Sequence, residues 1–221
     1  FFKQSVPIIN TFPEPFLATL ITLSTHSPFS LPPDLRTLPI PPAAGISPFQ
    51  QEYLQSVHYA DAAIGAFIAD LKAAKLYDNS LIVIFGDHGS FIKIADALGK
   101  KLPAIPESQA SQVPLIILAP GADLGGVVAA PGSHLDLYPT VANLLGLLPP
   151  PTAFGQDLLN TKTPLVIHRQ LISGAIKNFF TDKLAYQSAA DGVFEHSGCL
   201  ELPSEKKLPP AACREIYDQA A

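Results

Sequence analysis

The chain has 221 residues, of which 48% are hydrophobic and 15% charged, with a formal net charge of -5. This composition excludes a disordered chain and allows a domain with a substantial core. The acidic balance argues against nucleic acid as a partner. No unbroken apolar run approaches the ~18 residues of a transmembrane helix. The chain opens with Phe1-Phe2-Lys3 and not with Met or a signal peptide, so it is expected to be a processed or truncated piece.

The first element expected along the chain is a strand over residues 16–24 (FLATLITLS), because a continuous apolar run of this length suits a buried, parallel strand. A long helix follows. Ser47 is placed as its N-cap and Pro48 as its first residue. Apolar residues then recur at helical spacing until the helix ends near residues 77–79.

Further strands and helices are predicted by the same criteria of apolar run length, periodicity and turn residues. They are strands at 81–85, 113–119 and 164–167, a helix at 135–145, and a late hairpin formed by 183–187 and 192–195 around an Asp191-Gly192 turn.

Strands that alternate with helices define an α/β fold with a mainly parallel sheet flanked by helices. We expect one domain, with an α/β core over residues 1–160 and a β-rich part with a small hairpin over residues 161–221. Active sites in such sheets lie beyond the carboxyl ends of the strands. Both His26 and the Asp87-His88 pair follow a predicted strand, so the sequence places them at one edge of the sheet.

The strongest chemical signal is the pair Asp87-His88, because a carboxylate and an imidazole both bind divalent cations. Adjacent side chains normally point apart. The flanking Gly86 and Gly89 would allow the sharp turn that brings both to one ion. The alternative is an ordinary strand-to-loop turn in which Asp87 caps the backbone and His88 is incidental.

His26 could donate a hydrogen bond or a proton to an anionic substrate, or it could be a loop histidine bonded to backbone. Ser24 and Thr25 have no activating base beside them and are interpreted as polar residues at a strand end. His134 and Asp136 are assigned to helix capping.

His58 and Asp61 lie on or beside the long helix and are interpreted as part of its polar face or as a local packing contact. No role is assigned to the two remaining histidines, His168 and His196.

The only two cysteines, Cys199 and Cys213, enclose a short loop. A disulfide fits an oxidising compartment and would contribute roughly 3 kcal/mol by restricting the unfolded chain. The alternative is two unrelated thiols. A zinc site is disfavoured, because the pair lacks close spacing and further ligands.

Several segments together resemble lipoteichoic acid synthases and related phosphoglycerol transferases, which belong to the alkaline phosphatase superfamily. The resemblance covers most of the chain and rests on the combination more than on any single motif. Its segments are 20–29 (LITLSTHSPF), 53–61 (YLQSVHYAD), 76–89 (LYDNSLIVIFGDHG), 113–117 (VPLII), 134–140 (HLDLYPT), 154–159 (FGQDLL) and 191–195 (DGVFE).

The resemblance implies a sulfatase-like fold in an extracytoplasmic domain, periplasmic or at the cell surface, whose parent protein is tethered by membrane segments outside this chain. It implies transfer of phosphoglycerol from phosphatidylglycerol to a glycan or lipid acceptor through a Thr nucleophile. It also implies a divalent metal, commonly Mn with Mg or Zn as alternatives. The metal-binding pair of the family corresponds to Asp87 and His88, and its substrate-binding histidine to His26.

The sequence departs from the family in one large respect, because nothing in it matches the family's metal-binding Glu or Thr nucleophile, which lie in an N-terminal half. The fragment alone is therefore expected to be inactive. Two alternatives stay open: a sulfatase or phosphodiesterase of the same superfamily, and a truncated domain that only binds an anionic headgroup or glycan.

Overall fold

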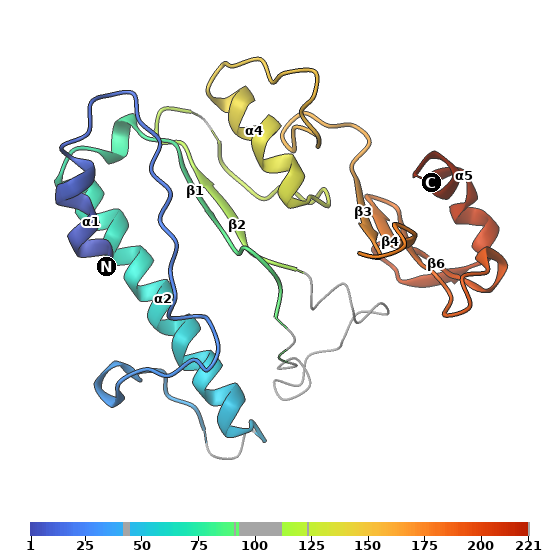
Figure 1. The fold of residues 1–221 in the computed structure, drawn as a ribbon, viewed down its shortest axis with the longest axis horizontal. Coiled ribbons are helices and arrows are strands. Elements are labelled where there is room, and N and C mark those ends of the chain that lie inside the picture. The colour runs from blue at the N-terminus through green and yellow to red at the C-terminus, as the bar shows by residue number, and fades with distance from the viewer. Residues whose placement is uncertain (42–44, 91, 93–111, 123, 221) are drawn as a thin grey trace. The chain divides into compact units, whose positions relative to one another are not determined.

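The computed structural model describes residues 1–41, 45–90, 92, 112–122 and 124–220 (Figure 1). The chain forms two compact units, residues 1–125 and residues 126–221. The expectation of one domain, with an α/β core over residues 1–160 and a β-rich part over 161–221, stays a prediction. Each unit is described by itself.

The first unit consists of helices and a two-stranded sheet. Its elements are α1 (Phe2–Ile9), the 3-10 turn η1 (Pro33–Leu35), α2 (Pro48–Ala73), the 3-10 turn η3 (Tyr77–Asn79), β1 (Ile82–Phe85) and β2 (Leu115–Leu118).

Helix α2 begins as its sequence predicts. The Ser47 hydroxyl accepts a hydrogen bond from the Gln50 N–H, and the Gln50 side chain accepts one from the Ser47 N–H, which forms a reciprocal capping box. The helix ends at Ala73, a few residues earlier than expected, and η3 then leads into β1. Helix α1 packs on α2 through Phe2 and Phe67, whose ring centroids are 4.8 Å apart.

The strands β1 and β2 pair antiparallel, with Ile82 opposite Leu118 and Phe85 opposite Leu115. All strand pairs among the described residues are antiparallel, so the mainly parallel order expected from sequence is not found there. The apolar runs at 81–85 and 113–119 were correctly identified as strands. Their composition could not settle direction, because a continuous apolar run indicates only that both faces can be covered.

Residues 16–24 do not form the predicted strand. They are extended but make no strand ladder with the described part of the chain. Leu17, Ile21 and Leu23 are 92%, 81% and 77% exposed. A strand requires a partner for its backbone groups as well as a suitable composition, and composition alone led to the incorrect prediction.

The second unit is mainly β-structure. Its elements are the 3-10 turn η4 (His134–Asp136), α4 (Leu137–Leu144), β3 (Leu165–Arg169), β4 (Ile176–Thr181), β5 (Leu184–Gln187), the 3-10 turn η5 (Phe194–His196), β6 (Gly198–Glu201), β7 (Lys206–Leu208), the 3-10 turn η6 (Pro210–Cys213) and α5 (Arg214–Ala220).

The strands β3 to β7 form an antiparallel sheet in sequence order, within the region predicted to be β-rich. The strand expected at 164–167 and the helix expected at 135–145 are both present, as β3 and as η4 followed by α4. The late hairpin differs from its prediction. Residues 194–196 form a 3-10 turn, and β5 pairs with β6 instead.

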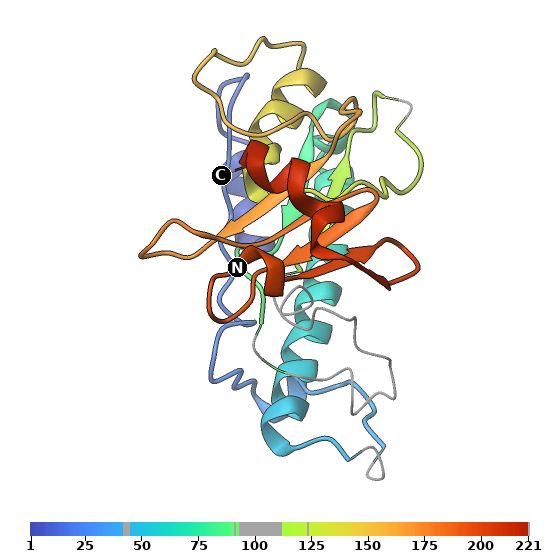
Figure 2. The ribbon, with the colours of Figure 1, turned by 90° about the vertical axis from the view of Figure 1, so that its right-hand side faces the viewer.

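The core of the second unit lies between this sheet and α5, which covers one of its faces (Figure 2). Phe179 and Tyr186 are almost wholly buried and their rings stack at 5.0 Å. Tyr217 of α5 meets Phe194 at 4.9 Å. Burial along β4 does not simply alternate: Lys177 is exposed, but the neighbouring Asn178 and Phe179 are both buried, so the middle of the strand is covered on both faces.

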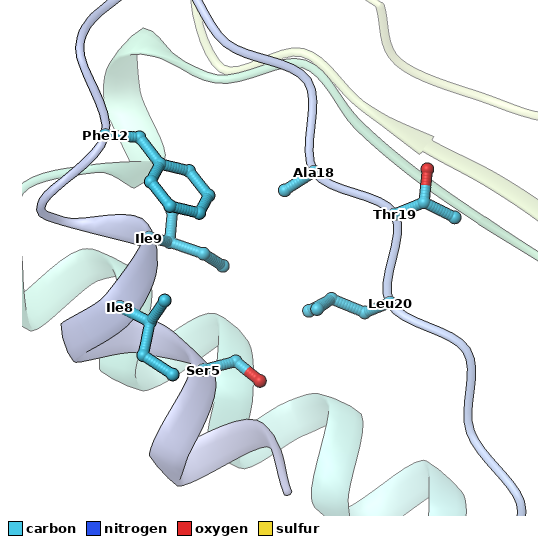
Figure 3. A pocket seen from close by; sticks show the side chains of 7 residues that line it. All are labelled: Ser5, Ile8, Ile9, Phe12, Ala18, Thr19 and Leu20. Atoms are coloured by element: carbon cyan, nitrogen blue, oxygen red, sulfur yellow. The ribbon is translucent and has the colours of Figure 1, made fainter.

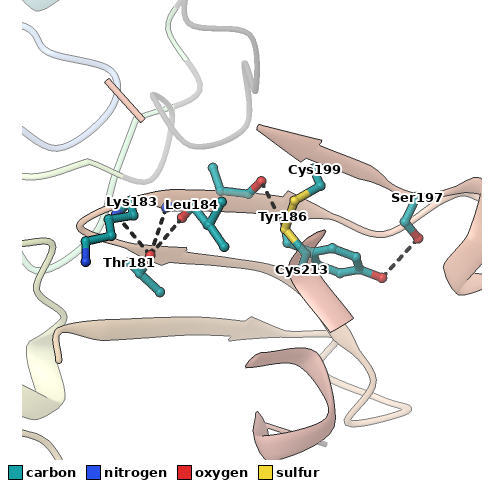
Figure 4. The surroundings of a disulfide bond; sticks show 8 residues. Thr181, Lys183, Leu184, Tyr186, Ser197, Cys199 and Cys213 are labelled. Atoms are coloured by element: carbon teal, nitrogen blue, oxygen red, sulfur yellow. Dashed lines mark hydrogen bonds between the residues drawn. A yellow bond between two sulfur atoms is a disulfide. The ribbon is translucent and has the colours of Figure 1, made fainter. Parts of the chain in front are cut away.

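Cys199 and Cys213 are joined by a disulfide, the pairing considered from sequence, with their Cα atoms 6.0 Å apart (Figure 4). Both are buried in the same core. Beside them the Tyr186 hydroxyl meets the Ser197 hydroxyl at 3.0 Å, which gives the buried phenol a polar partner. The disulfide thus links β6 to the segment that leads into α5.

Candidate functional site

The pair Asp87-His88 follows β1, separated from it only by Gly86. The contacts of Gly86 hold the backbone immediately before the pair. The Gly86 N–H donates to the Pro114 carbonyl at 3.2 Å, which continues the β1–β2 pairing by one residue. A Cβ on Gly86 would lie 2.9 Å from the Val113 Cβ. Gly86 is therefore required for a close approach between chain segments, and not for the left-handed backbone that its position before the pair suggested.

Asp87 and His88 both project into solvent, with side chains 85% and 74% exposed. The Asp87 carboxylate accepts from the His88 N–H at 3.0 Å, and the His88 Nδ1 contacts the Gly89 carbonyl at 2.8 Å. An Nδ1–H that donates to this carbonyl leaves the Nε2 lone pair available to a cation.

The separation of the two donor atoms is within the limit for two ligands of one divalent ion. The Asp87 Oδ2 and His88 Nε2 atoms are 3.9 Å apart. Ligand atoms at about 2.1 Å from one cation can be separated by at most about 4.2 Å. The distance therefore allows both side chains to bind one ion, at a wide angle between the two ligands. Within the described ranges, however, no group of three or more His, Cys, Asp or Glu side chains surrounds a potential metal position.

His26 is presented by a turn that follows residues 16–24. Its N–H donates to the Leu23 carbonyl, and its own carbonyl accepts from the Phe29 N–H, both at 3.0 Å. Phe29 is buried, and its ring meets the Tyr53 ring of α2 at 5.2 Å. The turn is thus anchored to α2 while the imidazole stays exposed.

The His26 Nδ1 contacts the Ser27 carbonyl at 2.8 Å. Because this contact engages Nδ1, Nε2 is the ring nitrogen left to meet a substrate. No hydrogen bond or ion pair of the described residues joins His26 to Asp87 or His88. The three residues share the first unit, but the structure does not assemble them into a closed constellation.

Asp136 performs the capping role that its position predicted. It is buried, and one carboxylate oxygen accepts from the Ser133 N–H at 2.6 Å and the Ser133 hydroxyl at 3.1 Å. The other oxygen accepts from the Gln156 N–H at 2.7 Å. These bonds link residues 133–136 to the segment at Gln156 and engage both carboxylate oxygens. Asp136 is therefore a structural residue.

A second exposed carboxylate–imidazole pair was not assigned from sequence. The His196 Nδ1 lies 2.6 Å from the Asp191 Oδ2 in the loop between β5 and β6. The hydrogen bond to Asp191, with its charge, raises the pKa of His196 above its ordinary value of 6.5. The same bond lowers the pKa of Asp191. A spacing of five residues does not place two side chains next to each other on a helix or a strand. The contact therefore could not be predicted from sequence and is seen only in the folded loop.

No helix in the described part of the chain combines the length and apolar character needed to cross a membrane.

Residues 1–147 match the sulfatase family, and the chain belongs to this family. The family lies in the alkaline phosphatase superfamily. Within that superfamily, the chain fits the lipoteichoic acid synthases. It is 36% identical over 152 residues to lipoteichoic acid synthase 1 of Bacillus subtilis strain 168, covering 66% of this chain and 23% of that protein. Lipoteichoic acid synthase 2 of the same strain is 34% identical over 190 residues, which cover 83% of this chain and 28% of that protein.

The solved structure of the lipoteichoic acid synthase LtaP from Listeria monocytogenes superposes with a TM-score of 0.79 at 26% identity, covering 99% of this chain and 57% of that one. The sulfatase-like fold expected from sequence is thereby confirmed. The chain spans about a quarter of the two Bacillus proteins, and just over half of the solved LtaP chain.

Proposed function

We propose that this chain is the part of a phosphoglycerol transferase that supplies the Asp87-His88 metal ligands and the substrate-binding His26. The observation that carries the proposal is the exposed Asp87-His88 pair after β1, with donor atoms 3.9 Å apart, in a chain whose relatives are lipoteichoic acid synthases. The reaction would move phosphoglycerol from phosphatidylglycerol to a glycan or lipid acceptor.

The chain's own residues would have distinct tasks in this reaction. Asp87 would offer a carboxylate oxygen to the cation, and His88 its Nε2, with the ring held by the Gly89 carbonyl. His26 would bind a phosphate oxygen or protonate the departing group through Nε2, because its Nδ1 is engaged by Ser27. The Thr nucleophile and the remaining metal ligand would come from residues outside these 221.

A divalent ion bound by Asp87 and His88 would neutralise charge on the phosphate and make a hydroxyl a better nucleophile. We propose Mn, with Mg and Zn as alternatives. An aspartate oxygen together with an imidazole nitrogen suits Mn and Zn, whereas Mg favours a site made wholly of oxygen.

We further propose that the domain works outside the cytoplasm, in a parent protein tethered to the membrane by other segments. The disulfide between Cys199 and Cys213 supports this location, because such bonds persist in oxidising compartments. An anionic lipid headgroup is the natural donor for a site that combines a cation with a histidine.

The test is to assay the full-length parent protein with Asp87→Asn, His88→Ala and His26→Ala, measuring release of diacylglycerol from phosphatidylglycerol and bound Mn. We expect the first two to lower activity by at least about 100-fold and to reduce Mn content, because each removes a metal ligand. His26→Ala should lower activity while Mn content is retained.

The matched control is the other exposed pair, changed as Asp191→Asn and His196→Ala. It contains the same two residue types in contact, so an effect of general charge or expression would appear in both sets. Equal losses in the two sets would contradict the assignment. If the unchanged parent protein hydrolyses a sulfate ester or phosphodiester but never transfers phosphoglycerol, and the site variants lose that hydrolysis, the protein is a hydrolase. If Asp87→Asn, His88→Ala and His26→Ala all leave the activity unchanged, this domain has no catalytic part and would only bind an anionic headgroup or glycan.

A further inference from the structure

The loop between β3 and β4 carries the most exposed large apolar side chains in the described part of the chain. Leu171 and Ile172 are 101% and 100% exposed, and they are called the apolar tip below. Figure 2 shows this loop projecting beyond the sheet of the second unit. Single exposed apolar residues are common on protein surfaces, but two adjacent ones at the end of a projecting loop indicate contact with another body.

The loop is held by hydrogen bonds among its own residues. The Gln170 N–H donates to the Ala175 carbonyl at 2.8 Å, and the Gly174 N–H donates to the Gln170 carbonyl at 2.9 Å. The Arg169 guanidinium donates to the Gly174 carbonyl, also at 2.9 Å. Gly174 has a φ of +68°, which glycine adopts without strain. Because these bonds close the loop beneath the apolar tip, its two side chains are presented outward in a defined turn.

The apolar tip differs in kind from the apolar residues of segment 16–24 in the first unit. There, Ala18 and Leu20 point toward α1 across a cavity of about 310 Å³, whereas Thr19 points away (Figure 3). Ala18 and Leu20 therefore take part in packing inside their own unit. The apolar tip belongs to a loop whose two ends are bonded to each other. Its side chains, and not its backbone, are what a partner would meet.

The charges next to the apolar tip are positive. Arg169 is the last residue of β3 and Lys177 is the second residue of β4, so both lie at the base of the loop, and both are exposed. Residues 158–181 contain no Asp or Glu. Two apolar side chains flanked by two cations suit the surface of an anionic lipid bilayer, because apolar groups enter the interface while Lys and Arg meet the headgroups.

The neighbouring loop at the same end of the sheet does not reverse this charge. The β5–β6 loop begins beside Lys177, whose carbonyl accepts a backbone hydrogen bond from it at 2.9 Å. The two acidic residues of that loop contact cations of their own. Asp191 meets His196 and Glu195 meets Arg214, both at 2.6 Å. The positive charge at the base of the β3–β4 loop is therefore not neutralised by these carboxylates.

A lipid surface fits the apolar tip better than a protein partner does. The residues beside the tip, Gln170 and Ser173, are polar, and their side chains hydrogen-bond at 2.8 Å. The apolar surface therefore does not widen toward the roughly 800 Å² per partner of a stable protein interface. A bilayer needs no such area, because a few apolar side chains and cations add to whatever else holds the protein at the membrane.

We propose that Leu171 and Ile172 insert into the interface of an anionic lipid bilayer, with Arg169 and Lys177 against its headgroups. The contact would hold the second unit at the membrane surface. The inference rests on the proposed function only for a location beside a membrane. It does not depend on which ester the domain cleaves or on the metal ligands.

The first test uses fluorescence, because the chain contains no Trp and a single introduced one reports its own surroundings. With vesicles of phosphatidylglycerol and phosphatidylcholine, Leu171→Trp should show a blue-shifted emission that brominated acyl chains quench. The matched control is Leu148→Trp, at a residue 95% exposed in a segment, 144–156, without charged residues. Its emission should not shift. No shift for Leu171→Trp, or equal shifts for both variants, would overturn the proposal.

The second test measures how the 221-residue chain partitions onto the same vesicles. Leu171→Ser combined with Ile172→Ser should lower the partition coefficient by at least about 10-fold. Lys177→Gln should lower it about 5-fold, and only when phosphatidylglycerol is present. The matched control, Leu147→Ser combined with Leu148→Ser, should leave it unchanged. All variants should unfold within about 2 °C of the parent chain, since the changes are at the surface. Equal losses in the two double variants would overturn the proposal.

Light scattering without lipid separates a bilayer from a second copy of the chain. We expect a monomer whose mass does not change with Leu171→Ser and Ile172→Ser. A dimer that these changes dissociate would assign the apolar tip to self-association and overturn the proposal. None of these measurements involves turnover. A parent protein that binds vesicles through the tip but transfers no phosphoglycerol would therefore contradict the proposed function alone, and one that transfers it without this contact would contradict the present inference alone.

Discussion

The sheet of the second unit and residues 16–24 of the first unit contrast in how completely they bury their apolar residues. In the second unit, Phe179 and Tyr186 are 0% and 1% exposed beneath α5, beside a disulfide. In the first, Leu17 and Ile21 are 92% and 81% exposed although they lie in a strongly apolar run. The sheet of the second unit thus encloses a core, whereas residues 16–24 of the first unit leave most of their apolar side chains exposed. The candidate metal ligands belong to the unit that contains this exposed segment.

The largest effect that this comparison predicts is for Phe179→Ala. We expect it to lower the free energy of unfolding of the second unit by about 3–5 kcal/mol, because a fully buried aromatic ring is lost and a cavity is left. Leu17→Ala, at an exposed residue, should change stability by less than about 0.5 kcal/mol. Urea titration followed by tyrosine fluorescence measures both, and comparable losses would refute the contrast.

Loss of the disulfide should come next. Replacing both cysteines by Ala should destabilise the second unit by about 3 kcal/mol, since the bridge closes a loop with a sequence separation of 14 residues. The transition of the first unit should not move. A double mutant as stable as the parent chain would show that the core of the second unit does not need the bridge.

A smaller effect is expected at Gly155, where an added Cβ would lie 2.2 Å from the Leu135 carbonyl oxygen at a φ of +94°. Gly155→Ala should cost about 2–3 kcal/mol, from left-handed backbone strain and a clash with backbone. Gly146→Ala is the matched control. Its φ is +67°, but nothing lies within 4 Å of the added Cβ, so it should cost about 1 kcal/mol. Thermal unfolding of the two variants measures both losses of stability. Equal losses would show that the backbone around Gly155 moves to accommodate the added Cβ.

The smallest predicted effect is the pH response of the Asp191–His196 pair. Since the folded pKa of His196 lies above 6.5, its stabilising contribution is fully present below pH 6.5 and is lost as the pH rises through the folded pKa. Asp191→Asn should return the pKa of His196 toward its ordinary value, as followed by NMR titration of the imidazole protons. High salt should weaken the shift, because the pair is exposed. An unchanged pKa in the variant would contradict the interpretation.

Much of the local structure could be predicted because it depends on neighbouring residues. The capping box of Ser47 and Gln50 needs only residues one helical turn apart, so the start of α2 was predictable. The same holds for Asp136, whose capping bonds reach back to Ser133. Its bond to Gln156, twenty residues away, was not predictable, because the turn chemistry of one segment says nothing about which loop packs on it.

The candidate site divides in the same way. Asp87 and His88 were identifiable because they are adjacent and follow an apolar run, and both facts are local. Gly86 was correctly singled out but for the wrong reason, since its constraint comes from Val113 on the neighbouring strand. The Asp191–His196 contact was missed because it depends on the path of a folded loop.

The sequence by itself determined the family, the positions of most helices and strands, and the residue types that could hold a cation. These properties follow from periodicity, capping and short motifs. Only the tertiary structure decided the direction of the β1–β2 pair, the exposure of residues 16–24, and which residues form the core of the second unit. Each of these depends on which distant segment supplies hydrogen-bond partners and covering side chains, and an apolar run carries no record of its partner.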